Sequence, residues 1–148
     1  MTDQSPNYLP DLARDMALIS TLEGEFVLRS GQISHRYFDK YRFEGDPALL
    51  RRLAKAMSTL LPTETEIVAG LELGGVPIAT AISLETGLPA AFVRKEAKTY
   101  GTCRAIEAQD IAGRKVTFIE DIISTGGAVA DAHALADAEG ADILGVVC

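Results

Sequence analysis

The sequence predicts an α/β fold in which a parallel sheet is flanked by helices. Four short runs rich in apolar and β-branched residues, at about 66–70, 90–94, 115–120 and 143–148, have the length and composition of buried strands. The segments between these runs have helical composition, and this alternation is typical of a parallel sheet that helices cover on both faces. Glycine pairs follow two of the runs closely, which is typical of strand-to-helix turns.

Length and composition indicate one ordinary globular domain. The chain has 148 residues, of which 47% are hydrophobic and 24% charged, enough to bury a proper core. No apolar run approaches membrane-spanning length, and the N-terminus lacks a signal-peptide pattern, so we expect a cytoplasmic protein without a membrane partner. The net charge of −7 argues against a nucleic-acid partner. Cys103 and Cys148 make neither a disulfide framework nor a metal cluster.

The N-terminal part reads as a helix followed by a hairpin. Apolar residues recur at helical spacing from Pro10 to Leu22, and residues 25–41 have the composition of two short strands around a Ser-Gly turn. Taken alone, Arg29, Tyr37 and Phe38 are better explained as a solvated charge and a small core than as a site.

A second helix and the first glycine turn come next. Asp46 and Pro47 are a typical helix start, with the acid as the cap and proline in the first turn, and this helix runs to about Leu61. After the strand at 66–70, the Gly74-Gly75 turn can present two backbone N–H groups to a ligand. A plain strand-to-helix turn explains these two glycines equally well.

A cation-rich segment follows the strand at 90–94. Residues 94–104 contain four cations, although the chain is acidic overall. Such a run is usually a solvated loop. Here it follows a strand of the same alternating series, so we expect it at the carboxyl edge of the sheet, where α/β proteins bind ligands. Local positive charge at that edge favours an anionic ligand.

The stretch 115–128 is the one around which the rest is organised. A buried strand ends in Glu120-Asp121, then comes a turn with two hydroxyls and two glycines, and a helix begins at about Ala128. Backbone N–H groups at a helix N-terminus form a phosphate site. The turn is neither a P-loop nor a G-x-G-x-x-G fingerprint. Two acids would repel a phosphate but suit the hydroxyls of a ribose 5-phosphate, or a metal ion; the alternative is a turn with incidental acids.

This stretch resembles the phosphoribosyl-diphosphate (PRPP) motif of type I phosphoribosyltransferases. The order Val-Arg-Lys-Glu-x-Lys-x-x-Gly at 93–101 and the order Leu-Arg-Ser-Gly-Gln-x-Ser-x-x-Tyr-Phe-Asp at 28–39 look like segments of the orotate branch. The resemblance implies transfer of a phosphoribosyl group from PRPP to orotate. It implies PRPP contacts for Arg94, Lys95, Lys98, Tyr100, Glu120, Asp121, Ile122, Ile123, Ser124, Thr125, Gly126, Gly127 and Ala128.

The resemblance also implies roles and partners. Lys98, Glu120 and Asp121 would be catalytic, with Lys98 on a flap that closes over the neighbouring subunit's site in a homodimer. The cofactor would be Mg²⁺, for which no protein ligand is assigned. The residues expected to contact orotate are Ser124, Arg29, Tyr37 and Phe38.

The resemblance implies a single domain, residues 1–148, in which residues 1–45 form a hood over the ligand edge of an α/β core at 46–148. The chain departs from the family pattern at three places. Many members have Lys where this chain has Arg29 and His where it has Tyr100, and members normally continue after the last strand with an Arg-containing segment that grips orotate. We therefore expect either a fragment or an incomplete pyrimidine site. A transferase for another base and a non-catalytic PRPP-binding regulator are the alternatives.

Overall fold

The computed structural model describes residues 8–102 and 104–148 of the chain, so Cys103 lies outside the described residues. The chain divides into two compact units, residues 1–52 and 53–148, and the boundary falls inside helix α3 (Pro47–Ser58). Within the described ranges, none of the helices is both long enough and apolar enough to cross a bilayer.

The first unit contains a helix and a hairpin, as the sequence predicted. Helix α1 (Tyr8–Ser20) leads directly into strand β1 (Thr21–Val27), which pairs antiparallel with β2 (Ile33–Phe38). The turn between the strands is closed by the N–H of Leu28, which donates to the carbonyl of Gln32 at 2.8 Å. A four-residue helix, α2 (Tyr41–Glu44), was not predicted.

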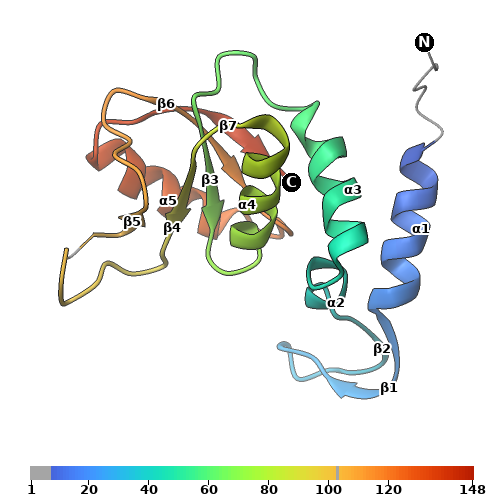
Figure 1. The fold of residues 1–148 in the computed structure, drawn as a ribbon. Coiled ribbons are helices and arrows are strands. Elements are labelled where there is room, and N and C mark those ends of the chain that lie inside the picture. Colours follow the sequence, from blue (N-terminus) through green and yellow to red (C-terminus); the bar gives the residue numbers. More distant parts are fainter. Residues whose placement is uncertain (1–7, 103) are drawn as a thin grey trace, which may run out of the picture. The chain divides into compact units, whose positions relative to one another are not determined.

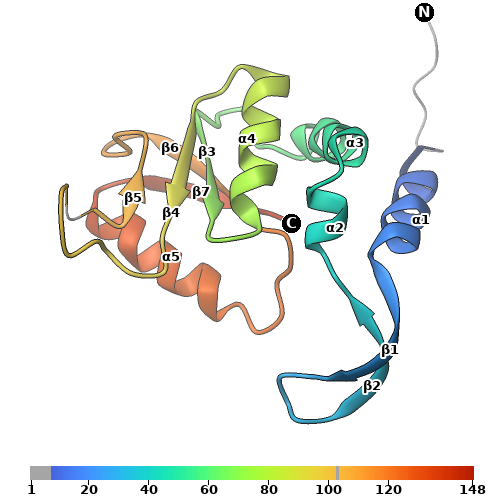
Figure 2. The ribbon, with the colours of Figure 1, turned by 60° about the horizontal axis from the view of Figure 1, so that its bottom comes forward.

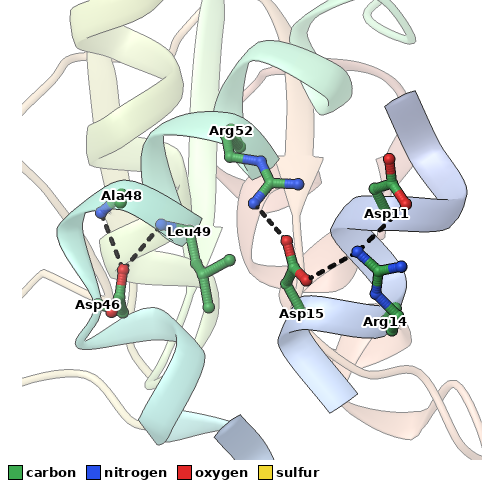
Figure 3. Close-up of polar contacts among 7 residues, drawn as sticks. All are labelled: Asp11, Arg14, Asp15, Asp46, Ala48, Leu49 and Arg52. Carbon is green, nitrogen blue, oxygen red and sulfur yellow. Dashed lines mark hydrogen bonds and ion pairs between the residues drawn. The ribbon is translucent and has the colours of Figure 1, made fainter. Parts of the chain in front are cut away.

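The start of α3 confirms the predicted cap. Oδ1 of Asp46 accepts the N–H groups of Ala48 at 3.0 Å and Leu49 at 2.9 Å, which satisfies two of the donors that a helix start leaves unpaired (Figure 3). On the next turns of the same helix, Nη1 of Arg52 lies 2.8 Å from Oδ2 of Asp15 in α1 (Figure 3). The hydrogen bond from Arg52 lowers the pKa of Asp15. The pair ties α1 to the first turns of α3.

The second unit is built on a five-stranded sheet of order β5-β4-β3-β6-β7. Four strands run parallel, as predicted, and the fifth, β5, is a two-residue edge strand antiparallel to β4 that the sequence did not predict. The sheet is therefore mixed rather than purely parallel. The strands are β3 (Ile67–Leu71), β4 (Ala90–Val93), β5 (Ile106–Glu107), β6 (Lys115–Ile119) and β7 (Asp142–Val147).

Two helices cover the two faces of this sheet. Helix α4 (Gly75–Thr86) connects β3 to β4, and helix α5 (Gly127–Ala138) connects β6 to β7. The two connections leave the sheet centre in opposite directions, and parallel crossovers are right-handed, so the helices must lie on opposite faces. Figures 1 and 2 show α4 and α5 with the sheet between them.

The core of the second unit lies along the central strands. Every residue of β3 is buried, and the last four residues of β6 are buried as well. Side chains such as Phe118 and Ile67 pack with Ala132 and Ala136 from the inner face of α5. Each large apolar side chain buried in this way stabilises the fold by roughly 1.5–3 kcal/mol. A buried hydrogen bond joins the hydroxyls of Thr65 and Thr117, which lie 2.8 Å apart. The rigid centre fixes the loops at its carboxyl edge.

Candidate active site

The strand order places a binding crevice between β3 and β6. These strands are neighbours, and the chain leaves one toward β4 and the other toward β7. In an open α/β sheet, the crevice for a ligand lies outside the carboxyl ends of the strands at such a reversal of direction. The segments at that point are residues 72–75 and 120–127, which contain the first glycine turn and the acid pair with the second turn.

The first glycine turn packs directly against the acid pair. A Cβ atom at Gly74 would overlap the carboxylate of Asp121, and a Cβ at Gly75 would overlap the carbonyl oxygen of Ile119. Only glycine lets these two loops come this close. The sequence left open whether the Gly74-Gly75 turn faces a ligand or is a plain strand-to-helix turn; the structure gives a packing reason for both glycines. The peptide bond just before this turn, Glu72–Leu73, is cis.

The two acids are bonded to the backbone of their own turn. Glu120 is 6% exposed, and its Oε1 accepts the N–H of Asp121 at 3.0 Å. Asp121 is half-buried, and its Oδ1 accepts the N–H of Ile122 at 2.8 Å. The carboxylates therefore hold the junction between β6 and the turn in one shape. Their predicted contact with ribose hydroxyls stays a prediction.

The second glycine turn leads into the N-terminus of a three-turn helix. Gly126 has a φ of +79°, a left-handed conformation that favours glycine, and α5 begins at the next residue. Ser124 and Thr125 are exposed, and the N–H of Gly127 makes only a long contact, 3.5 Å, to the hydroxyl of Thr125. The first-turn N–H groups of a helix lack intrahelical partners and attract anions. This geometry suits a phosphate, as the sequence predicted.

One pocket joins the cationic segment to this helix start. Its volume is about 310 Å³, and it brings together Arg94 and Lys95 with Gly127 and Ala128, four of the residues predicted to contact PRPP. Lys98, Tyr100 and the acid pair are not among its lining residues. The full lining is Leu71, Glu72, Val93, Arg94, Lys95, Gly127, Ala128, Asp131, Ala132 and Leu135.

Within that pocket, the backbone positions the cations. The N–H of Lys95 donates to Oε2 of Glu72 at 3.3 Å, so an acid from the loop after β3 fixes the exit of β4. Nε of Arg94 is buried and has no hydrogen-bond partner among the described residues. A buried guanidinium donor without a partner is costly unless an anion accepts from it. Nε of Arg94 is therefore available to donate a hydrogen bond to an oxygen of a ligand.

Lys98 lies elsewhere in the cationic segment. The segment leaves and rejoins the sheet through the N–H of Arg94, which donates to the carbonyl of Ala105 at 2.8 Å. Nζ of Lys98 lies 2.5 Å from Oε1 of Glu107 in β5. Tyr100 is 70% exposed. Sequence reasoning missed Glu72 and Glu107, because no motif distinguishes them from other surface acids.

The end of β7 adjoins the acid pair. Burial raises the pKa of the Cys148 thiol, and the nearby carboxylates of Glu120 and Asp121 raise it further, while a hydrogen bond from the N–H of Ile123 acts in the opposite direction. The net shift of this pKa is upward. Among the described residues, no group of three or more His, Cys, Asp or Glu side chains is arranged to hold a metal ion.

The residues predicted to contact orotate from the N-terminal part belong to the first unit. Arg29 is exposed in the turn of the hairpin. Tyr37 and Phe38 are 45% and 44% exposed. The ring of Tyr37 lies 5.5 Å from that of Phe26, and the ring of Phe38 lies 6.2 Å from that of Phe43, measured between centroids. Each aromatic side chain thus keeps one face packed and leaves part of its surface open.

Comparisons with known proteins place this chain in a family. No family model matches the chain. An orotate phosphoribosyltransferase from a Nocardioides species is 57% identical over 137 residues, which cover 93% of this chain and 76% of that protein. This chain therefore spans about three quarters of the length of that relative.

Solved structures give the same result. A crystal structure of Mycobacterium tuberculosis orotate phosphoribosyltransferase with Fe(III) dicitrate matches with a TM-score of 0.82 at 32% identity, over 94% of this chain and 81% of that one. A second structure of that enzyme, in complex with PRPP, matches with a TM-score of 0.78 at 27% identity, over 94% of this chain and 80% of that one. The fold of this chain is thus that of a type I phosphoribosyltransferase, and the chain belongs to the orotate phosphoribosyltransferase family.

Proposed function

We propose that this chain transfers the 5-phosphoribosyl group of PRPP to the ring nitrogen of orotate, giving orotidine 5′-monophosphate and diphosphate in pyrimidine biosynthesis. The observation that carries the proposal is the pocket in which Arg94 and Lys95 face the start of α5. PRPP has two anionic groups, and this unit offers a cationic segment and an amide-lined turn to receive them. The chain's membership of the orotate phosphoribosyltransferase family supports orotate as the acceptor base.

The chemistry asks mainly for electrostatic stabilisation. Breaking the bond between C1 of the ribose and the diphosphate oxygen builds positive charge on the sugar and negative charge on the leaving group. Arg94, Lys95 and Lys98 would stabilise the leaving diphosphate. The protein need not supply a nucleophile, because the ring nitrogen of orotate itself attacks C1. Keeping water out of the site would prevent hydrolysis of the activated sugar.

The phosphate turn would hold the other end of PRPP. The N–H groups at the start of α5 and the hydroxyls of Ser124 and Thr125 would bind the 5-phosphate. Glu120 and Asp121 would accept from the ribose hydroxyls and favour the cationic sugar. Their bonds to the backbone of the turn support this role, because they pre-organise the carboxylates.

The resemblance also assigns four residues to the contact with orotate. Ser124 would lie beside the base, and Arg29 would supply a cation to it from the hairpin turn. Tyr37 and Phe38 would border its flat ring, and their partly open surfaces support this role.

We also propose that Mg²⁺ takes part, bound together with PRPP. The described residues offer carboxylates at the crevice, in Glu120 and Asp121, but no ready cage of three ligands. That donor set fits Mg²⁺, which usually binds through one or two carboxylates, waters and substrate phosphates. When bound, the ion would neutralise charge on the leaving diphosphate. We expect a chelator to abolish activity and added Mg²⁺ to restore it; full activity in excess chelator would contradict the proposal.

Finally, we propose a cytoplasmic homodimer whose active sites are shared between subunits, with Lys98 acting in the neighbour's site. The net charge of −7 supports the absence of a nucleic-acid partner.

The direct test is an absorbance assay of orotate consumption with PRPP and Mg²⁺. We expect turnover with orotate and none with adenine or hypoxanthine. Turnover with a purine would assign a different base. Tight binding of PRPP without turnover of any base would show a PRPP-binding regulator instead.

A further inference from the structure

Glu107 and Lys98 form an ion pair that no sequence pattern predicts. Oε1 of Glu107 lies 2.5 Å from Nζ of Lys98, and each side chain is 24% exposed. Both partners are held by backbone contacts. Glu107 is paired with Phe92 in the β4–β5 ladder, and the N–H of Lys98 donates to the carbonyl of Arg104 at 3.2 Å.

The pair sets Lys98 apart from the other cations of its segment. Arg94 and Lys95 line the pocket, and neither side chain forms an ion pair within the described part of the chain. Lys98 is outside the pocket lining, with its charge already neutralised by Glu107. Of the three cations that we propose act on the diphosphate, Lys98 is thus the one that has an ion-pair partner among the described residues.

We propose that Glu107 is a positioning residue that holds Lys98 in a resting position, and that the diphosphate of PRPP competes with Glu107 for this ammonium group. The inference rests on the proposed function. A half-buried pair feels a lower effective dielectric than a surface pair, so its attraction is stronger. A ligand that needs Lys98 released binds more weakly, in proportion to the fraction of molecules in which Lys98 is free. A diphosphate carries more charge than one carboxylate and can win this competition.

The structure also offers a matched control. Glu96 lies in the same segment as Lys98, is exposed, and forms no ion pair with any described residue. Glu96→Gln and Glu107→Gln remove the same charge from the same region, but only the second removes the partner of Lys98.

The first experiment measures orotate turnover as a function of PRPP concentration. We expect Glu107→Gln to lower the KM for PRPP about five-fold, which corresponds to the upper end of the range for exposed ion pairs, with kcat changed less than about two-fold. Glu96→Gln should leave both parameters unchanged. An unchanged or higher KM in Glu107→Gln, or a large fall in kcat, would overturn the proposal.

A double-mutant comparison tests whether the effect runs through Lys98. In a Lys98→Ala background, Glu107→Gln should no longer change the affinity for PRPP, measured as a Kd by direct binding because this background is inactive. If the Kd falls by the same factor without Lys98, Glu107 acts in another way and the proposal is wrong. Glu107→Asp, which keeps the charge on a shorter side chain, should lower the KM in the same direction by a smaller factor, and it serves if Glu107→Gln does not fold.

A chemical readout separates this proposal from the proposed function. Limited acetylation with acetic anhydride, followed by mass spectrometry, gives the reactivity of Lys98 relative to Lys95 in the protein without substrate. The ratio should rise in Glu107→Gln and stay constant in Glu96→Gln. An unchanged ratio would overturn the resting contact even in an active enzyme. A raised ratio in a chain without transferase activity would support the contact between Lys98 and Glu107 and contradict the proposed function.

Discussion

Ala108, immediately after β5, has a φ of 75°, a backbone conformation that residues other than glycine rarely adopt. The left-handed region costs an L-residue about 1–2 kcal/mol relative to glycine. Glycine in turn costs about 0.4–1 kcal/mol through the entropy of the unfolded chain. We therefore expect Ala108→Gly to raise the free energy of unfolding by about 0.5–1 kcal/mol, measured by urea denaturation.

The control for this prediction is Ala112→Gly. Ala112 is also exposed, and it is not among the residues with positive φ. There only the unfolded-state entropy changes, so the substitution should lower the free energy of unfolding by about 0.4–1 kcal/mol. Two shifts of the same sign would show that the backbone at Ala108 is not strained.

Gly74 and Gly75 are adjacent, but replacing each of them by alanine should have a different effect. A methyl group at Gly75 would meet a backbone carbonyl, that of Ile119, which cannot move without disturbing β6. We expect Gly75→Ala to lower the free energy of unfolding by about 1–3 kcal/mol. A methyl group at Gly74 would meet the carboxylate of Asp121 instead, so Gly74→Ala should displace a carboxylate that we propose binds the ribose.

The two variants are compared by thermal melting and by orotate turnover. Gly74→Ala should lose at least ten-fold in kcat/KM, as expected when a catalytic group is misplaced, while melting closer to wild type than Gly75→Ala. Wild-type turnover in Gly74→Ala would mean that the reaction does not depend on the position of the Asp121 carboxylate.

At the scale of elements, Glu66 joins the beginnings of two central strands. Its Oε2 accepts the N–H of Lys115 at 2.8 Å, and its Oε1 lies 3.2 Å from Nε of Arg114. The hydrogen bond from the Lys115 backbone and the charge of Arg114 hold the pKa of Glu66 below 4.5. A carboxylate whose pKa is lower in the folded state stabilises the fold above its unfolded pKa and loses this effect as the pH falls through the folded value.

We therefore expect wild type to be more stable than Glu66→Gln at pH 7, with the difference shrinking as the pH falls below about 4.5. Urea denaturation at pH 7, 4 and 3 measures it. Glu66 lies at the amino end of the strands, opposite the crevice, so turnover at pH 7 should not change. A difference that stays constant from pH 7 to pH 3 would show that Glu66 does not titrate with folding.

The elements that could be predicted from the sequence are those with a long periodic pattern. The four parallel strands and the helices between them follow from runs of apolar residues, and the start of α3 follows from Asp46 and Pro47. The edge strand β5 has two residues and the helix α2 has four, so neither has a period to detect. Both form because tertiary neighbours pair with or cover them.

The parts of the candidate site that could be predicted from the sequence are likewise the local ones. The glycine turns and the cationic segment are local features, and the structure brings Arg94 and Lys95 to the start of α5 as a parallel sheet requires. The partner of Lys98 was not predictable, because Glu107 belongs to an element that exists only through pairing with β4. The packing of Gly74 on Asp121 likewise joins two loops far apart in the sequence.

At the scale of the whole molecule, the open question is whether one chain holds a complete site. Lys98 is outside the pocket lined by Arg94 and Lys95, and the resemblance assigns it to the neighbour's site. Mixing subunits tests this assignment. If Lys98 acts across the dimer, a hybrid of Lys98→Ala with Asp121→Asn has both defects in one site and none in the other.

Random exchange at equal amounts makes half of the dimers hybrids, so we expect about a quarter of wild-type activity to return from two inactive variants. Mixing Lys98→Ala with the Lys98→Ala/Asp121→Asn double variant is the control, because every site then lacks Lys98 and no activity can return. If Lys98 serves its own subunit, each site of the hybrid keeps one defect. The mixture of single variants would then stay as inactive as its parts, and the release of Lys98 from Glu107 would have to turn it toward its own pocket.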